Sequence, residues 1–147
     1  MSIRVVPDVN QPSATIEIPL GKPLPDYDLH EVDQPTPREV DAVLVSQGFR
    51  DLVDDARGIL MDLLAHPPAP HHDRHAPIDF LPDGGSGPLE LMQLTGAICP
   101  GEDEVYRPGL WIVIKDPQAK PKTALTGATL ERITAIAREL AQRLQLV

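Results

Sequence analysis

The stretch REVDAVLVSQGFRDLVDDARGILMDLLAH, residues 38–66, is one of two long segments that contain none of the 17 prolines of this 147-residue chain. The other is KTALTGATLERITAIARELAQRLQLV, residues 122–147. Proline lacks a backbone N–H and clashes with the preceding helical turn, so helix interiors exclude it. The distribution of proline therefore predicts that the two main helices of the fold lie in these two segments.

The first segment follows a helix-capping signal and carries its apolar residues on one face. Thr36, Pro37 and Glu39 form a capping box, in which the threonine caps the helix and the glutamate bonds back to it. Apolar side chains then follow at steps of three and four residues: Ala42, Val45, Phe49, Leu52, Ala56, Ile59 and Leu63. This spacing predicts an amphipathic helix over about 37–65. Gly48, a poor helix former, is the position where this helix would bend or break into two.

The second segment shows the same spacing near the end of the sequence. Its apolar stripe consists of Leu130, Ile133, Ala137, Leu140, Leu144 and Val147. Thr126 and Thr129 are candidate N-caps, and Arg143 lies near the C-terminal end, where the helix dipole favours a cation. The pattern predicts a second amphipathic helix over about 127–146.

The two apolar stripes are narrow and allow two interpretations. Amphipathic helices of a small domain usually bury such stripes in their own core, whereas heptad-like stripes also pair helices of different chains. The residues that form either a core or a partner contact are Ala42, Val45, Phe49, Leu52, Leu130, Ile133, Leu140 and Leu144.

The remaining sequence favours strands and irregular chain. A β-hairpin is predicted from strands at about 89–99 and 110–115, because both are rich in apolar residues and a turn-forming segment joins them. Alternation at 14–18 indicates a further short strand. The expected fold class is α+β, with a Pro-rich, acidic, extended arm at 1–35. A single domain at 36–147 follows, with a loop rich in His, Pro and Gly at 66–88.

Charge and composition exclude several classes of protein. The net charge of −9 disfavours nucleic-acid binding, because neutralising phosphates requires clustered Lys and Arg. No apolar run approaches the ~20 residues that cross a bilayer, and the N-terminal sequence has no signal-peptide pattern. Cys99 is the only cysteine, so no intramolecular disulfide forms. We expect a cytoplasmic protein without membrane insertion, in which Cys99 is a buried thiol rather than a nucleophile.

Four of the five histidines lie within ten residues, in the loop that follows the first predicted helix. They are His66, His71, His72 and His75. Neutral imidazoles are ligands for zinc, nickel and copper, so this loop is a candidate transition-metal site. The prolines between the histidines argue against the helix that would place His71 and His75 on one face. A solvated polar loop is the alternative interpretation.

These features favour a non-catalytic protein-interaction subunit, an accessory, adaptor or structural component of a larger assembly. Its partners would be other protein subunits or a second copy of the chain. Two alternatives remain open. One is a metal-binding protein or metalloenzyme that uses the histidine loop. The other is an acidic inhibitor or immunity-type protein, in which Asp26, Asp28, Glu31 and Asp33 face a basic partner.

Overall fold

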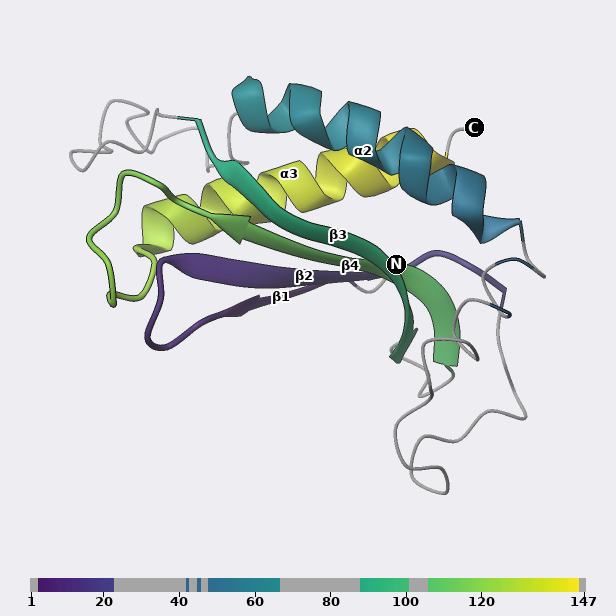
Figure 1. Ribbon diagram of the computed structural model, residues 1–147, viewed down its shortest axis with the longest axis horizontal. Helices are drawn as coiled ribbons and strands as arrows, with labels where there is room; N and C mark the ends of the chain where they lie inside the picture. The colour runs from purple at the N-terminus through teal and green to yellow at the C-terminus, as the bar shows by residue number, and fades with distance from the viewer. Residues whose placement is uncertain are drawn as a thin grey trace, which may run out of the picture.

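Two helices pack on one face of a four-stranded antiparallel sheet (Figure 1). This computed structural model describes residues 3–22, 42, 45, 48–66, 88–100 and 106–145. The strands and helices in chain order are β1 (Arg4–Pro7), β2 (Ser13–Pro19), α2 (Phe49–Ala65), β3 (Glu90–Pro100), β4 (Tyr106–Lys115) and α3 (Gly127–Gln145). The predicted α+β fold class is confirmed.

The sheet has the strand order β1-β2-β4-β3, and every neighbouring pair is antiparallel. The predicted hairpin is present as β3 and β4, and β4 begins four residues earlier than expected. The short strand predicted at 14–18 is β2, which lies in the interior of the sheet beside β4. Residues 4–19 therefore belong to the same sheet as residues 90–115. β1, which pairs with β2, was not predicted.

The core lies between the sheet and the helices. Alternate residues of the two inner strands are buried there, including Ile16 of β2 and Ile112 of β4, which are register partners. The helices contribute Leu60 from α2, and Ile133 and Leu140 from α3, all fully buried. Each large aliphatic side chain buried in this way contributes about 1.5–3 kcal/mol of hydrophobic free energy. α2 packs over the edge strand β3, whereas α3 packs over β1 and β2.

Gly48 interrupts the helix that was predicted to run from 37 to 65. Its φ of 65° is left-handed, a conformation that glycine adopts without the steric penalty of a Cβ atom. Its N–H donates to the carbonyl oxygen of Val45 at 3.0 Å, and α2 begins at the next residue. Ala42 and Val45 are helical and exposed. The capping box at 36–39 lies outside the described residues.

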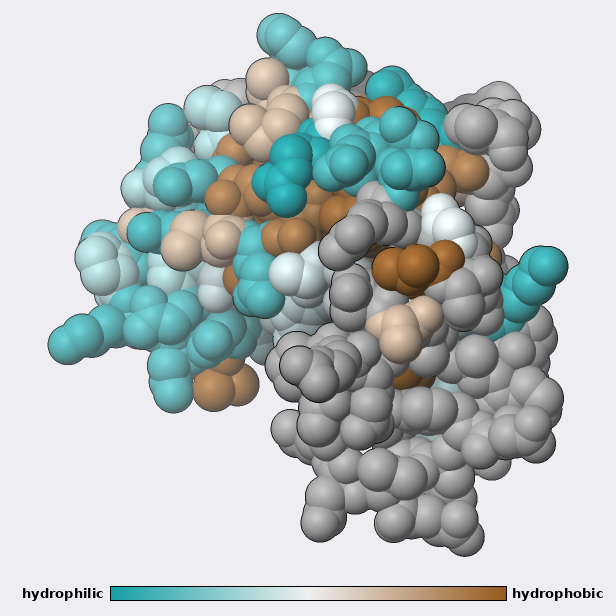
Figure 2. All heavy atoms as spheres, turned by 45° about the vertical axis from the view of Figure 1, so that its right-hand side comes forward, coloured by the Kyte–Doolittle hydropathy of each residue, from teal (hydrophilic) through white to brown (hydrophobic). Residues whose placement is uncertain are grey.

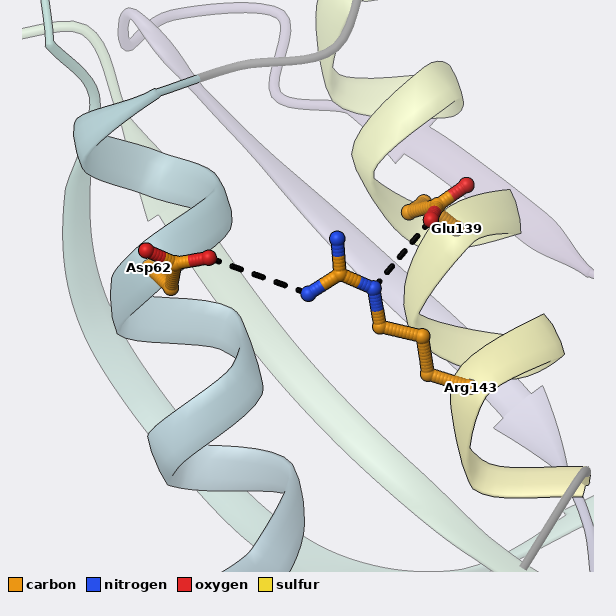
Figure 3. Close-up of polar contacts among 3 residues, drawn as sticks. All are labelled: Asp62, Glu139 and Arg143. Carbon is orange, nitrogen blue, oxygen red and sulfur yellow. Dashed lines mark hydrogen bonds and ion pairs between the residues drawn. The ribbon is translucent and has the colours of Figure 1, made fainter.

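α3 agrees closely with its prediction. Thr126 precedes it, and the Thr126 hydroxyl oxygen accepts the backbone N–H of Thr129 at 3.3 Å, as an N-cap does. Near its other end, Arg143 contacts two carboxylates (Figure 3). Arg143 Nε donates to Glu139 at 3.1 Å, and one terminal nitrogen lies 3.7 Å from Asp62 of α2. These groups are solvent-exposed, so the contacts add at most about 1 kcal/mol to the packing of α2 against α3. Neither helix is long and apolar enough to cross a membrane, nor is any other helical segment among the described residues.

Gly109 of β4 lies where the backbone of β2 and the side chain of Cys99 approach β4 closely. A Cβ atom at this position would collide with the carbonyl oxygen of Ile18 and would lie 2.8 Å from Cys99 Sγ. The absence of a side chain is therefore a packing requirement of the sheet.

We predict that Gly109→Ala destabilises the protein by about 1–3 kcal/mol, because the backbone of β2 must move to admit the methyl group. Gly127→Ala is the matched control. A Cβ atom there meets nothing within 4 Å, so this change should be neutral or stabilise α3 by up to about 1 kcal/mol. Urea unfolding followed by circular dichroism measures both free energies. Equal unfolding free energies for the two variants would contradict the packing requirement.

Candidate functional site

The residues predicted to form either a core or a partner contact mostly lie in the core of this chain. Ile133, Leu140 and Leu144 are buried, and Leu52 and Leu130 are half-buried against the same cluster. Ala42 and Val45 are exposed, Val45 with 52% of its surface accessible. Phe49 is the first residue of α2. The apolar stripes on α2 and α3 thus pack mostly within this chain. A partner would bind to other exposed residues of the domain.

The histidine loop cannot be assembled from the described residues. His66 ends α2 as an exposed residue, and its N–H donates to the Asp62 carbonyl oxygen at 2.9 Å. His71, His72 and His75 lie outside the described part of the chain, as do the four acidic residues at 26–33. Within residues 3–22, 48–66, 88–100 and 106–145, no three His, Cys, Asp or Glu side chains gather in a way that would hold a metal ion. The metal site remains a prediction from the sequence.

Cys99 is buried at the end of β3 and is a poor nucleophile. Only 1% of its surface is accessible, and its sulfur occupies the space beside Gly109. Burial raises the pKa of the Cys99 thiol to about 12, and the negative charge of Glu17 contributes in the same direction. A thiol of this kind stays protonated at neutral pH, which agrees with the expected buried, unreactive cysteine.

We predict that native protein reacts with a disulfide reagent such as DTNB at pH 8 at least about a hundredfold more slowly than unfolded protein. Burial raises the pKa of the Cys99 thiol to about 12, which lowers its thiolate fraction, and burial also blocks the approach of the reagent. Reaction in denaturant gives the reference rate. A native rate within tenfold of that reference would show that Cys99 is accessible and ionised.

A cluster of three buried polar residues lies between the end of β4 and the start of α3. Asp116, Thr129 and Arg132 are all buried, with Arg132 only 4% accessible. The Asp116 N–H donates to the Pro12 carbonyl oxygen at 2.9 Å, and its carboxylate accepts the N–H of Gln118 at 3.0 Å. Burial lowers the pKa of Arg132, and the charge of Asp116 opposes this shift. These contacts fix the loops at one end of the sheet, which is a structural role.

The face of the sheet opposite the helices carries two rows of side chains that cross all four strands. Side chains alternate between the two faces along a strand, and register partners on neighbouring strands lie on the same face. The strand residues that do not point into the core therefore share this face. The register places Val6, Thr15, Val113 and Gln93 in one row, and Arg4, Glu17, Trp111 and Thr95 in the other. We call these eight residues the open face. Both described helices pack on the other side of the sheet.

The open face combines apolar and polar side chains that retain solvent contact. Trp111, the only tryptophan of the chain, and Val113 are half-buried at its centre, and Val6 is 41% exposed at its edge. Arg4 lies 3.6 Å from the carboxylate of Glu17, which in turn is the register partner of Trp111. Gln93 and Thr95 are exposed on β3. The result is an apolar centre with hydrogen-bonding groups around it.

The sequence of β4 indicated an apolar surface on this face, but the spacing of its residues did not show which face the helices cover. Leu110, Ile112 and Ile114 alternate with Trp111 and Val113, so β4 is apolar on both of its faces. A strand with water on one face normally alternates apolar with polar residues. The apolar run therefore indicated that β4 needs cover on both sides, but not which side the helices take.

Comparisons with protein-family models, with curated proteins and with solved structures found no match.

Proposed function

We propose that this chain is a non-catalytic protein-interaction subunit of a larger cytoplasmic assembly, and that a partner subunit binds its open face. The observation that carries this proposal is the position of Trp111 and Val113, half-buried on the side of the sheet away from both helices. Tryptophan is enriched at the energetic centres of protein interfaces, where its large ring is covered on binding.

The polar residues of the open face support a protein partner. Thr15, Thr95 and Gln93 offer hydrogen-bonding groups around the apolar centre, and Arg4 and Glu17 add one charge of each sign. An apolar centre with a polar rim is the usual composition of an interface between subunits. The net charge of −9 does not favour a nucleic acid as the partner.

We predict that a photo-crosslinking amino acid at Thr95 captures a partner in cells and yields an adduct of discrete mass that differs from twice the mass of this chain, since Thr95 lies on the edge strand β3. The same amino acid at Gln142, an exposed position on the outer surface of α3, is the control and should yield none. Adding Trp111→Ala to the Thr95 probe should lower the adduct yield by about tenfold or more, because the central side chain of the interface is lost.

The companion variant Trp111→Phe separates loss of contact from loss of folding. It keeps an aromatic ring on β4, so it should retain more of the adduct than Trp111→Ala does. Circular dichroism of the purified variants checks that the sheet is intact. If Thr95 yields no adduct above the Gln142 background, the open face is not the partner site.

A further inference from the structure

The two edges of the sheet differ in how well they are protected against pairing with another strand. β1 has four residues and ends at Pro7. β3 has eleven residues, and its interior from 91 to 99 contains neither a charged residue nor a proline. Soluble proteins usually block an exposed edge by a short strand, a charge or a proline. Among the described strands, none pairs with the outer edge of β3, whose protective features are the bulge between Leu91 and Gln93 and the terminal residues Glu90 and Pro100.

Exposed methionines lie along this unprotected edge. Met92 on β3 is 55% exposed, at the bulge. Met61 on α2 is 54% exposed. At 100° per residue, Ile59 and Met61 lie on opposite sides of the core-facing Leu60, and Asp62, which contacts α3, lies on the Ile59 side. Met61 therefore points away from α3.

α2 runs along β3, and the Leu89 N–H lies 3.5 Å from the Leu64 carbonyl oxygen. The side of α2 away from α3 thus borders the free edge of β3. The space-filling view, with α2 at the top as in Figure 1, shows hydrophobic side chains at the surface beneath it (Figure 2). Exposed apolar side chains, those of Met61 and Met92, thus lie on α2 and on the edge strand beside it.

The charges on the same side of α2 favour a second copy as the occupant. Asp54 and Arg57 are both exposed and one turn apart. When two copies of this helix lie antiparallel, Arg57 of each can reach Asp54 of the other. A two-fold interface must be self-complementary in this way, and a β3 edge finds its missing neighbour in the β3 of the other chain.

We propose that the protein forms a two-fold symmetric dimer in which the β3 strands pair antiparallel and the α2 helices contact each other along the side that carries Arg57 and Met61. The pairing doubles the number of strands in the sheet and keeps the helices of both copies on one face. The edge of β3 adjoins the open face at Gln93 and Thr95, but the dimer contact uses the backbone of β3 and the side of α2 rather than Trp111. Either proposal can therefore fail without the other.

Light scattering and native mass spectrometry of the full chain, diluted from about 100 µM to below 1 µM, test the dimer. We expect a dimer that dissociates on dilution. Met92→Lys places a charge on the edge, and Met61→Lys places one between the helices, so each should weaken the dimer by about tenfold or more. Val9→Lys, at an 81% exposed position between β1 and β2, should leave the dimer unchanged.

A charge exchange identifies the partner as a second copy. Arg57→Asp and Asp54→Arg should each weaken the dimer by about tenfold, since each creates like-charge contacts at two symmetric places, and the double variant should restore it. Circular dichroism confirms that each variant is folded. A chain that stays monomeric at the highest concentration overturns the proposal. A dimer indifferent to both Met92→Lys and Met61→Lys overturns it equally, and a double variant that does not recover overturns the helix pairing.

Discussion

Burial of one face of the sheet beneath α2 and α3 is the constraint on which the rest of the structure depends. The inner strands β2 and β4 supply isoleucines to that face, and the helices cover them with Leu60, Ile133 and Leu140. Because side chains alternate along a strand, fixing one face also fixes which residues form the other. A shift of one residue in the β2–β4 register would pair Ile16 with Trp111 or Val113 in place of Ile112, so that either Glu17 of β2 or Trp111 of β4 would turn into the core. The open face therefore has its composition as a direct consequence of the core.

The same constraint explains the deep burial of the apolar stripes on α2 and α3. In a domain of this size, two helices are needed to cover four strands, so little of either stripe remains for another chain. The outer surface of α2 is different, because α2 lies over the edge strand and α3, the other helix whose bounds are described, packs on only one side of it. The asymmetry between a long β3 edge and a short β1 edge follows from the strand order, which places the hairpin at one side of the sheet.

Much of this fold could be predicted from where proline is absent and how apolar residues are spaced. α3 and the β3–β4 hairpin were found because both have strong periodic or apolar patterns with turn-forming residues at their ends. β1 was missed because Arg4–Pro7 is too short and too mixed to alternate visibly, and its pairing with β2 supplies its stability. Gly48 was identified as the position where the predicted helix would bend or break, and it adopts a left-handed conformation directly before α2 begins. The open face was not predicted, because a strand that is apolar on both sides does not reveal which side its own helices cover. The histidine and acidic clusters lie outside the described residues, so their roles remain predictions.

The burial of Cys99 against Gly109 gives the protein an unreactive thiol. The one thiol in the sequence is sealed between strands and stays protonated at neutral pH. A cysteine introduced at any exposed position would accordingly be the single reactive sulfur of the molecule. Spin labels, fluorophores or crosslinkers could then be attached selectively at the open face or along α2, with the natural thiol left in place and the sheet undisturbed.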